Sequence, residues 1–115
     1  MRTQRLGIRS SACGREHTLA LSGELDLASA DALNRRIRHV CSTGVAVLVL
    51  DLSGLTFMDS TGLHAVLGTD ELCRRNACDL RVKVGNGPIR RLVEICGVID
   101  APFVLDRGSN SPATA

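Results

Sequence analysis

A continuous apolar segment, residues 45–50 (VAVLVL), limits the possible folds of this chain more than any other feature. It contains several β-branched residues and ends at Asp51. A strand with one face in water alternates apolar and polar residues, so an unbroken apolar run predicts a strand that is buried on both faces. Strands of that kind occur in sheets that have helices packed against them. The segment therefore predicts an α/β fold.

The segments around this strand show the two periodicities of an α/β domain. Helical spacing of apolar residues predicts three helices, over 29–40, 60–76 and 88–97. Short apolar or alternating runs predict four further strands, over 6–10, 17–21 and 80–84 and within 98–105. The predicted order is β-β-α-β-α-β-α-β, which is a small mixed β-sheet flanked by helices. One domain is expected over residues 1–106, and the small and polar residues 107–115 predict a flexible C-terminal tail.

Composition excludes two large classes of partner. The 14 basic and 12 acidic residues give a net charge of +2, which is no electrostatic footprint for nucleic acid. Aromatic residues make up 2% of the chain, too few for a base-stacking platform. No apolar run approaches the roughly 20 residues of a membrane span, and the first residues lack the apolar core of a signal peptide. We therefore expect a cytoplasmic protein with no direct nucleic-acid contact and no membrane insertion.

The cysteines and histidines do not follow a metal-ligand pattern. The five cysteines are odd in number and include no C-x-x-C pair, and the spacing of Cys73 and Cys78 is unlike that of a zinc knuckle. His17, His39 and His64 do not pair with cysteines at ligand spacing. The sequence therefore predicts no metal site and no cofactor, and it predicts reduced thiols that are mostly buried.

The most informative stretch is D-S-T-G at residues 59–62, where a loop predicted over 53–59 ends and a helix begins. Ser60 is a candidate N-cap, whose hydroxyl can bond a free amide of the first turn. It is also a candidate phosphorylation site. A phosphate adds a charge of about −1.5 to −2, which the amides and dipole at a helix N-terminus tolerate. Asp59 would repel that charge, and a partner packed on this edge would lose its fit. Both interpretations remain open on these residues alone.

A hydrolase built on Ser60, with His64 on the same helix face and Asp59 adjacent, is a weaker alternative. A nucleophile elbow requires G-x-S-x-G, and Met58 stands where the first glycine is needed. Three triad members crowded into one short segment also leave no pocket for a substrate. We therefore expect no catalytic residues and no enzymatic activity.

Three blocks of sequence together resemble the STAS domain, and most closely the bacterial anti-sigma factor antagonists. They are GELDLASADAL at 23–33, VLDLSGLTFMDSTGL at 49–63 and PIRRLVEICGV at 88–98. They occur in the order and at the spacing of that family, and the resemblance extends roughly over residues 6–105. It implies a small mixed sheet flanked by helices, as the periodicities do.

The resemblance also implies a partner-switching mechanism. In that family the unphosphorylated antagonist binds an anti-sigma factor that is also a serine kinase, and this binding releases a sigma factor. The kinase uses ATP to phosphorylate the serine that corresponds to Ser60, which ends the binding, and a serine phosphatase restores it. The resemblance assigns Asp59 as the carboxylate beside the phosphoacceptor. It assigns Asp26, predicted in a loop after the second strand, as a loop carboxylate near it.

The same resemblance places the rest of the partner contact on Thr61, Gly62 and Leu63, with His64 beside them. This chain departs from the family at two of these positions. The family usually has glycine in place of His64, and serine is common in place of Thr61. Glycine lets a partner approach the helix closely, so an imidazole is expected to change partner choice or to add a pH-sensitive contact.

A rival function keeps the fold and changes the role. STAS domains also serve as non-phosphorylated scaffolds, for example as the accessory subunit of a lipid-transport ABC complex. Ser60 or Thr61 would then be a binding contact and a helix cap only. An intact serine after Asp59 favours the phosphorylation switch. A homodimer through the exposed edge of the small sheet is a further possibility that the sequence leaves open.

Overall fold

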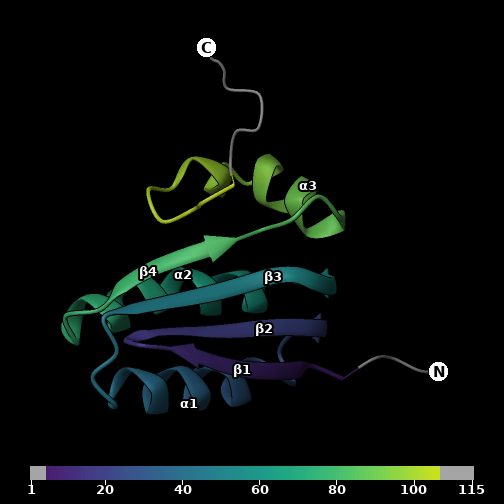
Figure 1. Ribbon diagram of the computed structural model, residues 1–115. Coiled ribbons are helices and arrows are strands. Elements are labelled where there is room, and N and C mark those ends of the chain that lie inside the picture. The colour runs from purple at the N-terminus through teal and green to yellow at the C-terminus, as the bar shows by residue number, and fades with distance from the viewer. Residues whose placement is uncertain (1–4, 107–115) are drawn as a thin grey trace.

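Four strands and three helices follow one another along residues 5–106, the part of the chain that the computed structural model describes (Figure 1). In chain order they are β1 (Gly7–Cys13), β2 (Glu16–Leu25), α1 (Ala30–Cys41), β3 (Val47–Met58), α2 (Ser60–Arg75), β4 (Asp79–Lys83) and α3 (Pro88–Ile95). A short 3-10 helix, η1 (Val98–Asp100), follows α3. The α/β class and the mixed sheet predicted from the sequence are confirmed. The predicted tail, 107–115, lies outside the described residues.

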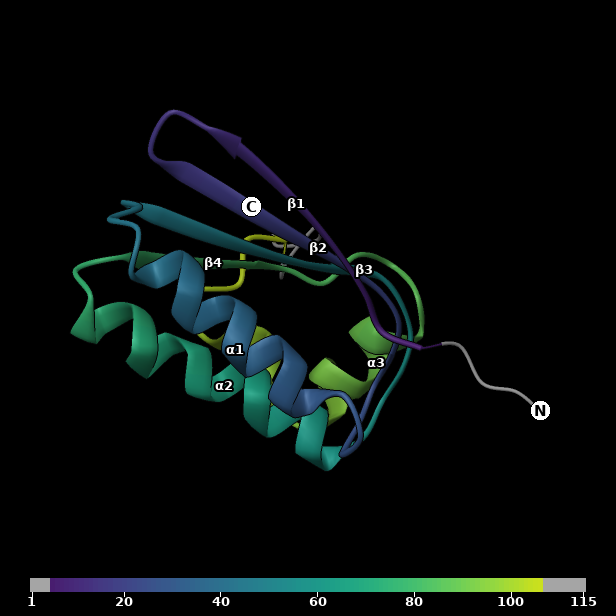
Figure 2. The same ribbon diagram turned by 90° about the horizontal axis from the view of Figure 1, so that it is seen from below.

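The sheet has the strand order β1-β2-β3-β4. β1 and β2 form an antiparallel hairpin, whereas β2, β3 and β4 are parallel. Parallel neighbours need a crossover, and α1 and α2 provide the two crossovers. Both helices lie side by side on the same face of the sheet (Figure 2). They begin where β2 and β3 end, so the loops that precede the two helices meet at one edge of the molecule.

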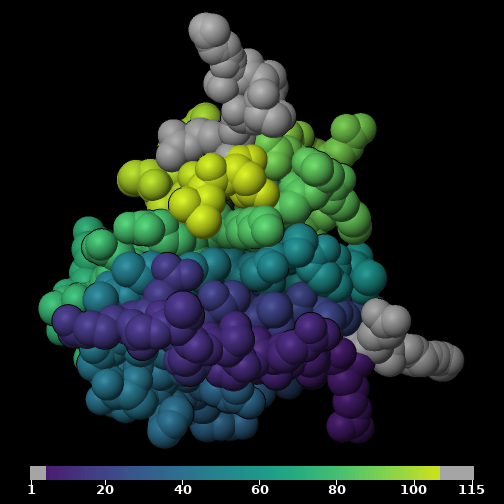
Figure 3. Space-filling model, in the orientation of Figure 1, coloured from purple at the N-terminus to yellow at the C-terminus, as the bar shows by residue number. Residues whose placement is uncertain are grey.

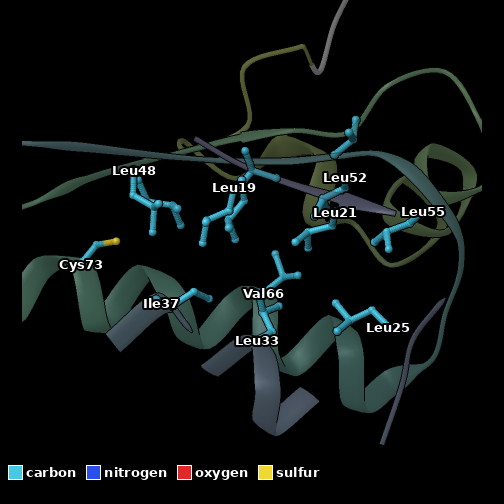
Figure 4. Packing of buried hydrophobic residues seen from close by; sticks show 14 of the residues in the cluster. Leu19, Leu21, Leu25, Leu33, Ile37, Leu48, Leu52, Leu55, Val66 and Cys73 are labelled. Carbon is cyan, nitrogen blue, oxygen red and sulfur yellow. The ribbon is translucent and has the colours of Figure 1, made fainter. Parts of the chain in front are cut away.

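The core lies between the sheet and the pair α1 and α2 (Figure 4). Leucines from β2 and β3, including Leu19, Leu21 and Leu48, point from the sheet toward the helices. Leu33 and Ile37 of α1 and residues of α2 meet them from the opposite side. Burying a side chain of this size stabilises the folded state by about 1.5–3 kcal/mol. This packing fixes both helices against the sheet.

No helix in the described part of the chain covers the opposite face, where the strands themselves form the surface (Figure 3). Leu48 and Leu50 of β3 are fully buried, but Val47 and Val49 between them are only half-buried. The prediction of a strand buried on both faces was therefore wrong. Neighbouring strands partly shield the outward valines, since Val49 lies in register with residues of both β2 and β4.

β3 also runs further than predicted. Asp51 lies in the middle of the strand, and the predicted loop at 53–59 is mostly strand. β2 likewise continues to Leu25 through the segment predicted as a loop. Two register shifts between β2 and β3 are β-bulges, which let strands keep pairing through turn-type residues. Gly54 permits this pairing, because a Cβ there would lie 2.7 Å from the carbonyl oxygen of Leu21.

The strand predicted within 98–105 does not form. The chain makes η1 there, followed by an isolated bridge to β4. The Val82 N–H donates to the Phe103 carbonyl oxygen at 2.7 Å, and the Leu105 N–H donates to the Val82 carbonyl oxygen at 2.8 Å. Pro102 lacks an N–H and limits strand pairing before this point. The segment nevertheless covers part of the outer edge of β4.

Asp106 fastens the end of this segment. Its two carboxylate oxygens accept the N–H groups of Val84 and Gly85, both at 2.9 Å. The Arg90 side chain donates to the Asp106 carbonyl oxygen at 2.7 Å. Burial alone would raise the pKa of the Asp106 carboxyl, but the backbone N–H groups and the charge of Arg90 outweigh it and hold the pKa below its ordinary value. Residues 103–106 are thus bound to β4 and α3.

Candidate functional site

The candidate site is the edge of the molecule at which α1 and α2 begin, made of residues 26–29 and 57–64 and called the Ser60 edge below. The Asp59 N–H donates to the carbonyl oxygen of Leu25 at 3.3 Å, so the end of β2 contacts the start of α2. Gly62 lies at the same contact, since a Cβ there would be 2.4 Å from that carbonyl oxygen. Asp26, which follows Leu25, is thereby brought to the edge that carries Ser60.

Asp59 is the N-cap of α2. Its backbone is extended, and its carboxylate accepts the Gly62 N–H at 2.9 Å. The prediction that Ser60 caps this helix was therefore wrong by one residue. Both residue types cap well, and the extended backbone at Asp59 decides between them. Ser60 becomes the first residue of the helix proper.

The Ser60 side chain is exposed and, among residues 5–106, its hydroxyl makes no hydrogen bond. The fold therefore does not use this hydroxyl. It lies at the N-terminal end of a 16-residue helix, whose first turn contains no acidic residue of its own. A helix N-terminus offers free N–H groups and the positive end of the dipole. A negative group attached at Ser60 is therefore compatible with the fold.

The loop that carries Asp26 is held in one conformation. The Asp26 carboxylate accepts the Ala28 N–H at 3.0 Å and lies 3.2 Å from the Ser29 hydroxyl oxygen, which has one hydrogen to share between this carboxylate and the Glu24 carbonyl oxygen. Ser29 stands at the N-cap position of α1, but its side chain makes no capping bond. It accepts the Asp26 N–H at 3.0 Å and donates to the Glu24 carbonyl oxygen at 3.1 Å. The loop therefore presents a fixed shape to a partner.

Two exposed apolar side chains on the Ser60 edge escaped the sequence analysis. Leu27, directly after Asp26, is 76% exposed, and Phe57, two residues before Asp59, is 47% exposed. Large apolar residues that remain in water beside a candidate site are typical of a protein interface. Leu27 precedes α1, so the apolar stripe of that helix does not include it, and no local sequence pattern distinguishes an exposed leucine there from a buried one.

The remaining predicted contact residues differ in how open they are. His64 is exposed and lies one helical turn after Ser60. Thr61 and Leu63 are half-buried, and Leu63 packs against the core. Gly62 is buried and holds α2 against β2. Among the predicted contact residues of α2, Ser60 and His64 are therefore the exposed ones. Thr61, Gly62 and Leu63 are wholly or partly buried beneath them.

The geometry does not form the relay of a hydrolase. The Asp59 carboxylate accepts a backbone N–H of its own helix, and no hydrogen bond joins Ser60 to His64 within the described range. A nucleophile, a base and an orienting acid must be linked in series for that chemistry. These three side chains are not linked in that way.

Three of the five thiols are buried together. The sulfur atoms of Cys41 and Cys73 lie 4.0 Å apart, and Cys78 is buried near them. Burial raises the pKa of both Cys41 and Cys73, which keeps the reactive thiolate form scarce. Cys13 and Cys96 are exposed. Cys96 directly follows Ile95, the last residue of α3.

No group of three or more potential metal ligands occurs among the residues that the structure describes. The same part of the chain contains no helix that is long and apolar enough to cross a membrane.

The sheet order, the paired crossover helices and a free serine beside a capping aspartate define a small α/β domain with an exposed serine at a helix N-terminus. The chain belongs to the STAS domain family, whose model matches residues 12–109. A relative, the anti-sigma F factor antagonist of Paenibacillus polymyxa, is 31% identical over 96 residues, which is 79% of each chain. The crystal structure of an anti-sigma factor antagonist from Mycobacterium paratuberculosis has a TM-score of 0.77 at 25% identity, covering 89% of this chain and 86% of that one.

A more distant structural neighbour is known in two states. The anti-sigma factor antagonist SpoIIAA has been solved in its unphosphorylated form, with a TM-score of 0.71, 21% identity and 86% coverage of both chains. The phosphorylated form of SpoIIAA from Bacillus has a TM-score of 0.65 and 20% identity, covering 88% of this chain and 89% of that one. At this identity the likeness establishes the fold that the two proteins share. These relatives and neighbours are anti-sigma factor antagonists.

Proposed function

We propose that this chain is an anti-sigma factor antagonist that binds a serine-kinase anti-sigma factor while Ser60 is unmodified. The binding releases a sigma factor, and phosphorylation of Ser60 by that kinase ends the binding. The observation that carries the proposal is the free Ser60 hydroxyl, which is exposed at the start of α2 and unused by the fold. A serine phosphatase would return the chain to its binding form.

The surroundings of Ser60 support a switch in which binding changes and the fold does not. A phosphate at Ser60 would lie at the positive end of α2, where the free amides tolerate it. It would also add about two negative charges beside the carboxylate of Asp59. A partner surface that matches the edge in its unmodified form would then meet extra bulk and like charge. Phosphorylation is therefore expected to weaken binding without unfolding the domain.

Leu27 and Phe57 give the unmodified edge an apolar component. Removing apolar surface of this kind from water at an interface favours binding, by roughly 25 cal/mol per Å² buried. Asp26 and Ser29 hold the loop that presents Leu27, so little loop entropy is lost on binding. Asp26 therefore acts in this proposal by positioning the loop, and its charge faces the same partner. Thr61, Leu63 and His64 extend the contact along α2.

The experiment that tests the proposal compares the wild-type chain with Ser60→Ala and Ser60→Asp as baits in lysate of the source cells. Bound proteins and the phosphorylated residue are identified by mass spectrometry. We expect the wild type and Ser60→Ala to retain one ATP-binding serine kinase, and Ser60→Asp to lose it. Only the wild type should become phosphorylated by that purified kinase.

Ser11→Asp is the matched control, since Ser11 is exposed on β1, far along the chain from the Ser60 edge. It adds the same charge to the chain and should bind as the wild type does. Equal binding of the kinase by Ser60→Asp and wild type would refute the switch. Retention of an ABC transporter ATPase by all baits would instead support the scaffold alternative, which the similar proteins do not favour.

A further inference from the structure

A groove that is open to solvent lies between α1 and α2. It encloses about 330 Å³ and is lined from both helices. Ala65 and Gly68 of α2, the smallest side chains in the lining, form its floor. Arg38 of α1 and Arg75 of α2 stand at its borders. Ala65 and Leu72 connect the lining to the hydrophobic core, whereas the arginines, His64, Gly68 and Glu71 are exposed.

The groove is open because Gly68 has no side chain. A Cβ at Gly68 would meet no heavy atom within 4 Å, and Gly68 is not among the residues with positive φ. Neither packing nor backbone conformation therefore requires glycine here. Glycine inside a helix costs about 0.5–1 kcal/mol relative to alanine. Gly62 in the same helix contrasts with it, since a Cβ at Gly62 would collide with β2.

The borders of the groove are basic. Arg38 has no acidic partner among residues 5–106. Glu71, the acid in the lining, lies 3.4 Å from the guanidinium of Arg75, and both side chains are about two-thirds exposed. Ion pairs as exposed as this one contribute little and exchange readily with other partners. The groove therefore offers one unpaired and one weakly paired guanidinium to an anionic group.

The groove is continuous with the Ser60 edge. His64 lines the groove, and it lies one turn of α2 after Ser60. A protein that covers Ser60 and reaches along α2 would enter the groove at this point. We infer that the groove is a second half of the partner-binding surface. It accepts an acidic segment of the same serine kinase that phosphorylates Ser60. This inference rests on the proposed function.

The first test fills the groove without adding charge. The probe is the purified serine kinase that phosphorylates Ser60, loaded with a non-hydrolysable ATP analogue, and the affinity is measured by calorimetry. We expect Gly68→Leu to weaken binding at least about tenfold, equivalent to about 1.4 kcal/mol. Gly68→Ala should bind within about threefold of the wild type, a difference of under about 1 kcal/mol. Both variants should unfold cooperatively, because the added atoms enter open space.

The second test reverses charge at matched positions of α1. Arg38 borders the groove, whereas Arg35 is exposed on the same helix and is not in the lining. We expect Arg38→Glu to weaken kinase binding at least about tenfold and Arg35→Glu to weaken it only a few-fold, since a charge outside the contact acts only at long range. Equal effects of the two reversals would overturn the inference that the groove receives an acidic segment.

The outcomes separate the inference from the proposed function. Wild-type affinity in Gly68→Leu, together with lost binding in Ser60→Asp, would overturn the groove and leave the Ser60 switch intact. Failure of the wild-type chain to bind or be phosphorylated by any serine kinase would overturn both. Weak binding in Gly68→Leu and Arg38→Glu, with normal binding in Gly68→Ala and Arg35→Glu, supports the groove.

Discussion

Asp59 and Asp106 both accept backbone N–H groups in this domain, and they do so with different results. Asp106 uses both carboxylate oxygens, on Val84 and Gly85, and binds the end of the described chain to β4. Asp59 accepts one N–H, that of Gly62, and leaves the neighbouring Ser60 hydroxyl free and exposed. In the first arrangement both carboxylate oxygens are occupied by backbone N–H groups, which stabilises the fold. The second leaves the Ser60 hydroxyl accessible without any loss of a hydrogen bond within the fold. A surface that is to be modified by an enzyme requires such a group.

The largest effect is expected where the Ser60 edge is most tightly packed. Gly62→Ala would place a Cβ 2.4 Å from the carbonyl oxygen of Leu25. Backbone cannot yield as a flexible side chain can, so we expect a loss of about 2–3 kcal/mol in the free energy of unfolding. Urea denaturation measures it, with Gly68→Ala as the control expected to gain about 0.5–1 kcal/mol. A neutral Gly62→Ala would mean that the edge is not packed as described.

Asp106→Ala is expected to cost about 2 kcal/mol, because the partly buried N–H groups of Val84 and Gly85 lose their acceptor. Kinase binding should not change, since Asp106 lies at β4 and not at the Ser60 edge. Asp100→Ala, an exposed aspartate of η1, is the control for stability. A loss of kinase binding in Asp106→Ala with unchanged stability would reverse the roles assigned to the two aspartates.

The contribution of Asp106 should depend on pH. The pKa of its carboxyl is held below the ordinary value in the folded state. A group of this kind adds stability that is fully present above the unfolded pKa, about 3.9, and that is lost as the pH falls through the folded pKa. We therefore expect the stability difference between wild type and Asp106→Ala to be constant near neutral pH and to shrink in acid. Denaturation curves at several pH values measure it, and a difference that grows on acidification would contradict the assignment.

The smallest effect is expected at the helix cap. Asp59→Ala should cost about 1 kcal/mol, the usual value of an N-cap side chain. Asp59→Asn keeps a capping oxygen and removes the charge, so its stability should be close to that of the wild type. Comparing the kinase affinity of the two variants then separates the charge of Asp59 from its capping role. Equal stability of Asp59→Ala and wild type would show that the Gly62 hydrogen bond contributes nothing.

Periodicity predicted most of the fold, because each element buries a regular stripe. It failed where contacts with a neighbouring strand overrode the turn or strand preference of individual residues. Gly54 and two β-bulges carry β3 through residues that resemble a turn. Pro102 limits the pairing of the last segment, which an apolar run alone does not reveal. Sequence patterns describe an isolated segment, whereas these outcomes depend on the neighbouring strand.

The candidate site was predicted in the same uneven way. The D-S-T-G stretch located the start of α2, but only backbone conformation could assign the cap to Asp59 rather than Ser60. Leu27 and Phe57 could not be recognised, because the exposure of an apolar side chain depends on which elements surround it. The α1–α2 groove joins residues more than 20 positions apart and has no local signature.

The segment that covers β4 also limits how copies of this domain can associate. Residues 103–105 occupy the Val82 hydrogen-bonding groups on the outer side of the sheet, while β1 forms the opposite border and pairs only with β2. Among the described residues, the β1 border is therefore the more open of the two for strand pairing between copies, and the segment after η1 protects the β4 border only around Val82.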